Sequence, residues 1–114
     1  MVWNSASVDS ILAMVLTALF AVAGMINLAG LGPVKRDFAR WGYPTWVRLL
    51  CGVLELSSAG LLLWQQTRLL GLALAGVVMI GALFTLLRNR EPFRHLAPAL
   101  IFSALVVLSV ALRS

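Results

Sequence analysis

Four long runs of apolar residues, separated by short polar segments, divide the chain. They cover residues 10–31, 45–64, 69–87 and 96–112. Each run is close to the roughly 20 residues that an α-helix needs to cross about 30 Å of hydrocarbon. Backbone groups that face lipid must be hydrogen-bonded within their own segment, so each run is expected to be a helix. The period-two alternation that is typical of membrane strands is absent.

The connections between the runs predict how the helices are arranged. Residues 65–68 and 88–95 form short connections, so consecutive helices are expected to be antiparallel neighbours. The sequence therefore predicts an all-α fold, a four-helix up-down transmembrane bundle with both termini on one side. The whole chain, residues 1–114, is expected to form a single membrane domain.

The first connection is longer and has a pattern of its own. Val34, Phe38 and Trp41 recur at positions i, i+4 and i+7, and charged residues fill the opposite face. This pattern predicts a short amphipathic helix over residues 33–41, lying in the membrane interface between the first and second membrane helices. Gly42 is placed to cap it. The alternative is a disordered basic loop that Trp41 holds at the membrane.

Composition also indicates that this chain lies in a lipid bilayer. The chain is 61% hydrophobic and 11% charged, with a mean hydropathy of +0.98, whereas soluble domains are about 45–50% apolar and about 25% charged. The net charge of +5 would suggest nucleic acid in a soluble protein. Here the basic residues lie in the gaps between apolar runs, so the lipid bilayer is the expected partner and nucleic acid is not.

Basic residues gather at one end of the predicted bundle. Arg68 and Arg113 are at the opposite end, and seven others are in the first and third connections and the adjoining helix ends: Lys35, Arg36, Arg40, Arg48, Arg88, Arg90 and Arg94. By the positive-inside rule, residues 32–45 and 88–95 are expected in the cytoplasm and both termini outside.

Aromatic residues mark the expected membrane interfaces, where their amphipathic rings are favoured. Trp41, Tyr43 and Trp46 are the predicted anchors on the basic face. Trp3 and Trp64 are the predicted anchors on the other.

Glu55, in the middle of the second run, is the main candidate for a functional residue. It lies about ten residues from the basic end of that run, or roughly 14 Å deep at the helical rise. A carboxylate at the membrane centre costs roughly 2.5–3.5 kcal/mol, so such a residue usually faces the protein interior and has a partner. Arg48, seven residues earlier, is expected to extend to the interface instead. Burial without a counter-charge favours the neutral carboxyl.

Three neutral polar residues are expected near this acid: Asn27, Ser58 and Ser103. Ser58 shares its helix face, and a neutral carboxyl could donate a hydrogen bond to Asn27 or Ser103. Two interpretations follow. The cluster could bind a lipophilic molecule with a polar or cationic head, or a protonated Glu55 could tie the helices together.

The sequence contains no motif for a cofactor, a nucleotide or a catalytic triad. His95 is the only histidine and is expected at the start of the fourth helix. Cys51 is the only cysteine, so it cannot form an internal disulfide. No metal site is predicted. A quinone or a lipid is the candidate for a bound small molecule.

Several segments, taken in order, resemble the DoxX-like family of small four-helix membrane proteins. They are residues 23–28, Phe38 with residues 42–46, residues 52–56, residues 72–79, and His95 with Pro98 and Ala99. The resemblance implies an integral membrane protein of bacterial type, in the inner membrane. The family often has a lysine where this chain has Asn27, which implies a neutral neighbour for Glu55 in place of an ion pair.

Three functions are compatible with these features, one of which is that of a pure assembly factor. The leading hypothesis is a non-catalytic inner-membrane protein that binds a small lipophilic molecule or a partner membrane protein around Glu55. The alternative is a small membrane subunit of a quinone-linked redox complex, because family members have been linked to a thiosulfate:quinone oxidoreductase subunit and to oxidative-stress complexes. A partner protein would then have to carry the redox cofactors. Each of these functions is compatible with a homo-oligomer.

Overall fold

The computed structural model describes residues 5–113, with side chains described for residues 8–112. Trp3, one of the expected interface anchors, lies outside the described residues, as does the side chain of Arg113. The elements in chain order are α1 (Ser5–Ala29), α2 (Val34–Arg40), α3 (Thr45–Leu63), the 3-10 turn η1 (Gln65–Thr67), α4 (Arg68–Arg88) and α5 (Phe93–Arg113).

Four of these helices, α1, α3, α4 and α5, are long and apolar enough to cross a membrane. The predicted four-helix bundle is therefore confirmed, and so is the short helix in the first connection, which forms as α2. The boundaries differ slightly from the expectation. Helix α1 already begins at Ser5, and α5 begins at Phe93 because Pro92 in the connection starts its first turn.

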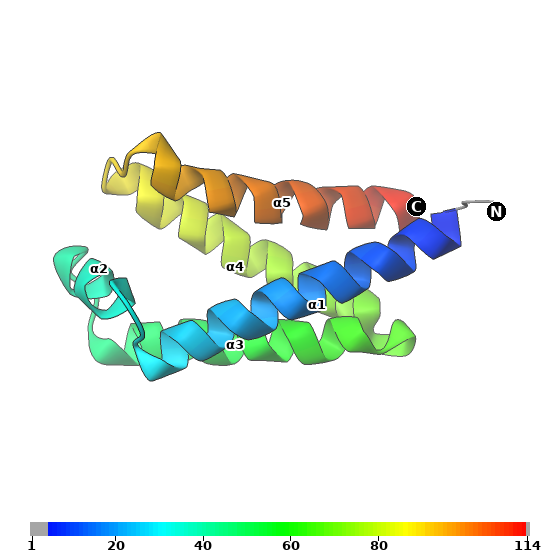
Figure 1. Ribbon diagram of the computed structural model, residues 1–114, viewed down its shortest axis with the longest axis horizontal. Helices are drawn as coiled ribbons and strands as arrows, with labels where there is room; N and C mark the ends of the chain where they lie inside the picture. Colours follow the sequence, from blue (N-terminus) through cyan, green and yellow to red (C-terminus); the bar gives the residue numbers. More distant parts are fainter. Residues whose placement is uncertain (1–4, 114) are drawn as a thin grey trace.

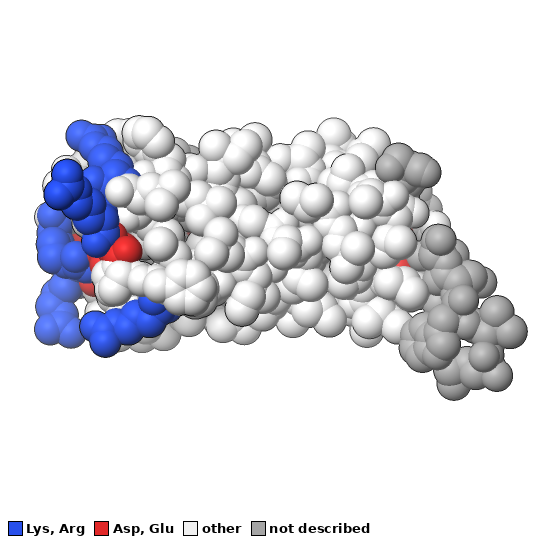
Figure 2. Space-filling model, turned by 90° about the horizontal axis from the view of Figure 1, so that it is seen from above, with Lys and Arg blue, Asp and Glu red and all other residues white. Residues whose placement is uncertain are grey.

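The four long helices form a closed ring in which α1 contacts α3 and α5, and α4 contacts the same two helices. The start of α1 and the end of α5 lie together at one end, and α2 lies at the other (Figure 1). We call these the terminal end and the basic end. Figure 2 shows the lysines and arginines gathered at the basic end, next to a long surface with almost no charged atoms.

The centre of the bundle is packed with apolar side chains. Leu16, Phe20, Leu62 and Leu72 are completely or almost completely buried, and Phe20 also meets the ring of Phe102 with 5.6 Å between centroids. The large side chains on the outer surface are apolar too, as expected where the solvent is lipid tails.

Glycines set how closely the helices approach. A Cβ added to Gly52 on α3 would lie 3.0 Å from the carbonyl oxygen of Gly24 on α1, so these two backbones are in contact. At the terminal end, a Cβ on Gly71 of α4 would lie 2.8 Å from the backbone nitrogen of Leu62 on α3. From that contact α4 diverges from α3 toward the basic end (Figure 1). Small residues at both contacts allow this packing without a hydrophobic driving force between helices.

Helix α2 ends in a Schellman motif, which turns the chain back toward the bundle. The N–H of Tyr43 donates to the carbonyl of Phe38 and the N–H of Gly42 to that of Ala39, both at 3.0 Å. Gly42 has φ of 82°, a left-handed conformation that favours glycine. The ring of Tyr43 lies against that of Phe38, with 6.1 Å between centroids. The predicted cap at Gly42 is therefore present.

Helix α4 ends in the same motif, but with an arginine in the glycine position. The N–H of Glu91 donates to Leu86 at 3.0 Å and that of Arg90 to Leu87 at 3.1 Å. Arg90 has φ of 53°, which costs a residue with a Cβ more than it costs glycine. This turn directs the side chain of Glu91 toward α2.

A buried polar cluster joins the four long helices at the terminal end. The guanidinium of Arg68 on α4 lies 3.3 Å from a carboxylate oxygen of Asp9 on α1, and its Nε donates to the carbonyl of Leu62 at 3.0 Å. Ser109 on α5 lies 3.5 Å from the other oxygen of Asp9. The position of Arg68 matches the expectation, but its pairing with Asp9 was not predicted.

Candidate functional site

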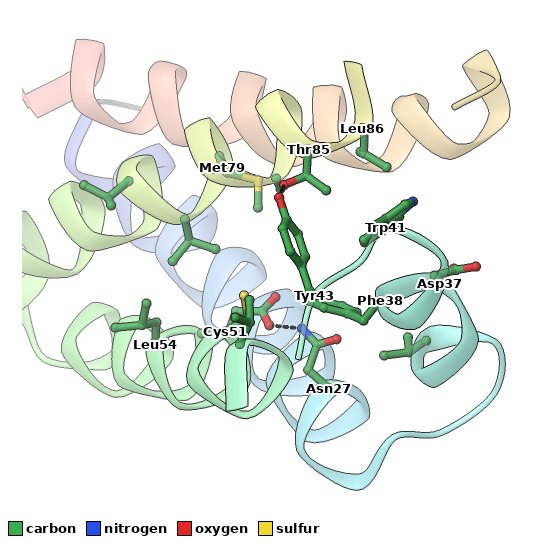
Figure 3. A pocket seen from close by; sticks show the side chains of 17 residues that line it. Asn27, Asp37, Phe38, Trp41, Tyr43, Cys51, Leu54, Met79, Thr85 and Leu86 are labelled. Carbon is green, nitrogen blue, oxygen red and sulfur yellow. Dashed lines mark hydrogen bonds between the residues drawn. The ribbon is translucent and has the colours of Figure 1, made fainter. Parts of the chain in front are cut away.

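A cavity of about 430 Å³ lies at the basic end, where α4 has diverged from α3. Its volume falls within the roughly 300–1,000 Å³ of small-molecule sites. Glu55 and Cys51 of α3 form one side, Met79 and Thr85 of α4 another, and α2 with the following turn covers the basic end (Figure 3). Most of the lining is apolar, and among the described residues of α1 it is Asn27 that contributes to it.

Glu55 is buried and lines the cavity. The side-chain amide of Asn27 donates a hydrogen bond to its Oε1 (Figure 3). The structure thus brings together two of the predicted site residues, with the donor and acceptor roles opposite to the expectation. In the described part of the chain the second oxygen, Oε2, has no hydrogen-bond partner. Glu55 therefore has one acceptor atom held by the protein and one available to the cavity.

Arg48 has no hydrogen bond or ion pair with Glu55 in the described part of the chain, as expected, but its side chain turns into the protein instead of outward. Its side chain is buried, and Nη1 donates to the main-chain carbonyl of Asn27 and, at 3.3 Å, to that of Leu28. The last carbonyls of a helix have no partner within the helix and carry its partial negative charge, so a cation is favoured there. The chain turns away at Gly30, which makes room for the guanidinium beside it. Arg48 therefore positions the residue that holds Glu55.

Ser58 and Ser103 are not part of this arrangement. Ser58 is fully buried, and its hydroxyl donates to the carbonyl of Leu54, one turn earlier on its own helix, at 2.9 Å. The hydroxyl of Ser103 is buried and has no hydrogen-bond partner in the structure. Neither residue lines the cavity. Spacing placed them at the right depth, but depth alone does not determine which way a helix face points.

Three aromatic rings form a roof over the cavity. The ring centroids of Phe38 and Trp41 are 5.2 Å apart, and those of Trp41 and Tyr43 are 6.4 Å apart. The hydroxyl of Tyr43 lies 2.9 Å from that of Thr85 (Figure 3). This contact links the turn before α3 to α4. Trp41 and Tyr43 were predicted as interface anchors, and the structure also gives them this internal role.

The other two predicted anchors, Trp46 and Trp64, point outward. They are 64% and 65% exposed in the isolated chain, at opposite ends of α3. Such rings are suited to the two membrane interfaces.

Glu91 fastens the roof to the connection between α4 and α5. Its Oε1 accepts hydrogen bonds from Trp41 Nε1 at 2.8 Å and from Arg40 Nη1 at 2.7 Å, and its Oε2 lies 2.9 Å from His95 Nδ1. We call these four residues the Glu91 clasp. The hydrogen bonds from Trp41 and His95, followed by that from Arg40, lower the pKa of Glu91 to about 2.

Sequence reasoning missed most of this clasp. His95 lies in the first turn of α5, as expected, and its spacing of four from Glu91 is a signal that could have suggested their contact. The pairing of Arg40 with Glu91 spans 51 residues and has no local signal. Within residues 8–112, no three His, Cys, Asp or Glu side chains are grouped so as to hold a metal ion.

The fold and the site define a class: a multi-pass helical membrane protein with a cavity beside a buried acid. The model of the DoxX-like family matches residues 11–109. The chain therefore belongs to the DoxX-like family, as the resemblance of its motifs implied. No curated protein and no solved structure matches it.

Proposed function

We propose that this protein is non-catalytic and binds a small lipophilic molecule in the cavity beside Glu55. One observation carries the proposal. A buried carboxyl with one oxygen held by Asn27 leaves its other oxygen beside a largely apolar space of about 430 Å³. Binding sites for small molecules commonly combine apolar walls with a few polar groups that orient the ligand.

The competing interpretation is that Glu55 only ties α1 to α3. Its bond with Asn27 is consistent with that role. Those two helices, however, are already held together by the contact of Gly24 with Gly52 and by Arg48 at the end of α1. A purely structural acid also gives no reason for a cavity beside it under an aromatic roof.

The cavity opens toward the lipid. Val77 and Gly81 on α4 line it and are also exposed on the outer surface of the bundle. A molecule dissolved in the membrane could therefore reach Glu55 between α3 and α4 without crossing the roof. This route supports a lipophilic ligand, such as a quinone or a lipid, over a water-soluble one.

The basic end supports a proposal on location and orientation. The exposed cations there include Lys35, Arg36, Arg88, Arg90 and Arg94. We place this end at the cytoplasmic surface of a bacterial inner membrane, where anionic lipids attract basic side chains, and both termini outside. A compartment reporter fused to the C-terminus tests this, because activity of a cytoplasmic reporter there would contradict it.

Native mass spectrometry of the protein released from nanodiscs tests the binding proposal. We expect the wild type to retain a small molecule in addition to its own mass. Gly81→Leu should reduce that retention, because Gly81 lines the opening and no atom lies within 4 Å of an added Cβ. Gly60→Leu is the matched control, since Gly60 has equally open surroundings but lies outside the cavity.

Three outcomes would count against the proposal. The wild type could retain nothing from native membranes, or both glycine variants could retain as much as the wild type. The third is a redox protein that copurifies in fixed stoichiometry and carries a cofactor, which would favour the alternative of a quinone-linked complex.

A further inference from the structure

We propose that the cavity selects a hydrophobic cation, an amine or a quaternary ammonium, with its charged group against Glu55. This inference rests on the proposed function and names the chemical class of the ligand.

The first argument is the sign of the charges that line the cavity. Asp37 and Glu55 are the charged residues among the described lining, and no Lys, Arg or His contributes to it. The chain as a whole has a net charge of +5, and its cations are concentrated at this same end. No basic side chain contributes to the described lining, and of the two acids there Asp37 is paired with Arg40, which leaves Glu55 as the acid available to a ligand.

The second argument concerns the charges next to the roof. Arg40 lies between two acids, 2.8 Å from Asp37 and 2.7 Å from Glu91. The charge of Arg40 is thus compensated within the protein by its pairing with two carboxyl groups. Arg40 therefore does not make the roof repel a cationic ligand.

The third argument is the geometry of Glu55. Because Asn27 donates to Oε1, Glu55 acts as an acceptor, and Oε2 offers a second acceptor to the cavity. A cation placed there would supply the counter-charge that this buried carboxyl lacks and so favour its ionised form, in surroundings of low dielectric constant where the attraction is strong. A neutral molecule would gain at most one hydrogen bond at the same position.

The aromatic roof supplies the fourth argument. Aromatic faces attract cations, and groups of such rings recognise quaternary ammonium ligands in other proteins. The guanidinium of Arg40 already lies 5.9 Å from the ring centroid of Trp41, so this ring is engaged by one cation from the protein itself. Phe38 and Tyr43 add further ring surface to the cavity.

A pair of probes of equal shape tests the inference. The first is 4-phenylbutyl-trimethylammonium, and the second is the hydrocarbon in which carbon replaces its nitrogen. Binding is measured by native mass spectrometry in nanodiscs of zwitterionic lipid, at equal probe concentration in the membrane. We expect the wild type to bind the cation at least tenfold more tightly than the hydrocarbon. The primary amine 4-phenylbutylamine then shows whether an N–H is needed.

Two variants test whether Glu55 causes the preference for the cationic probe. Glu55→Gln keeps the shape of the side chain and should lower cation binding at least tenfold while leaving hydrocarbon binding unchanged. Asp37→Asn is the matched control, because Asp37 is also an acid of the lining but is already paired with Arg40. It should change cation binding less than threefold.

Cys51 gives a measurement that needs no variant. It lines the cavity one turn before Glu55 on α3, so a bound cation should slow its reaction with a membrane-permeant maleimide. The hydrocarbon should protect it less at the same concentration.

Equal binding of the two probes, or an equal loss of both in Glu55→Gln, would overturn the selection of a cation and leave the proposed function standing. If neither probe binds and Cys51 reacts at the same rate with and without them, the inference fails, and the retention of a native molecule by the wild type and the glycine variants decides the proposed function separately.

Discussion

The guanidinium of Arg48 donates a hydrogen bond to the main-chain carbonyl of Asn27. The side chain of that same asparagine donates to Glu55. A basic residue of α3 thus fixes the end of α1, and through it the acid of the cavity, without contacting that acid. From its spacing Arg48 was expected to extend outward, whereas the structure makes it part of the support of the site.

Arg48→Gln should lower both stability and order at the site. Hydrogen bonds to charged groups contribute about 1.5–3 kcal/mol, so we expect the free energy of unfolding to fall by about 2 kcal/mol. The helix-end carbonyls would lose their partner, and Asn27 would be held less firmly. Arg36→Gln, on the exposed face of α2, is the control and should change stability by no more than about 0.5 kcal/mol. Thermal unfolding in mild detergent measures both, and equal effects would refute this role of Arg48.

Gly52→Ala should separate α1 from α3. The added Cβ would meet Leu28 Cγ at 2.7 Å and the carbonyl oxygen of Gly24 at 3.0 Å, and the latter cannot move without its helix. Overpacking of this kind typically costs about 1–3 kcal/mol. Gly60→Ala lies on the same helix with nothing within 4 Å, and should instead be neutral or stabilise by up to about 1 kcal/mol. The free energies of unfolding of the two variants, measured side by side, test this prediction. Equal values would show that the close contact of α1 with α3 is not required for stability.

Arg90→Gly should stabilise the protein. Arg90 occupies the left-handed position of the Schellman motif with φ of 53°, where glycine avoids the clash of a Cβ. We expect a gain of about 1 kcal/mol. Arg88→Gly, two residues earlier in the last turn of α4, should lose up to about 1 kcal/mol because glycine is unfavourable within a helix. A shift of both variants in the same direction would contradict this account.

The Glu91 clasp predicts a dependence of stability on pH. The pKa of Glu91 is lowered from 4.5 to about 2 in the folded protein, so the unfolded chain binds the proton more tightly. The stabilisation is therefore fully present above about pH 4.5 and is lost as the pH falls toward about 2. We expect the difference in unfolding temperature between the wild type and Glu91→Gln to be largest at pH 6 and to shrink below pH 4. A difference in unfolding temperature that stays constant over this pH range would show that Glu91 is not the source of the pH dependence.

The fold could be predicted because it depends on long, redundant signals. The apolar runs predict the four membrane helices, and the periodicity of Val34, Phe38 and Trp41 predicts α2. The pairing of Asp9 with Arg68 could not be predicted in this way. This pairing depends on how the helices are rotated about their axes. Asp9 and Arg68 both lie near helix ends, where the sequence pattern is equally compatible with a side chain that faces solvent.

The site was predictable in part, for a related reason. Rise per residue gives depth, and it correctly placed Asn27 within reach of Glu55. It gives no information on orientation around the helix, so Ser103 was grouped with them although its hydroxyl contacts neither. The cavity arises because α4 diverges from α3. This divergence depends on the close contact at Gly71, which lies at the opposite end of the bundle from the cavity.

The divergence of α3 and α4 also limits what the cavity can do. The two helices are closed at the terminal end by Gly71, and the buried side chains of Leu16, Phe20, Leu62 and Leu72 fill the bundle between that end and Glu55. The cavity is thus confined to the half of the bundle nearer the basic end. If a molecule binds there as we propose, it would enter and leave at the same end of the bundle, an arrangement suited to capture and release and not to transport across the membrane.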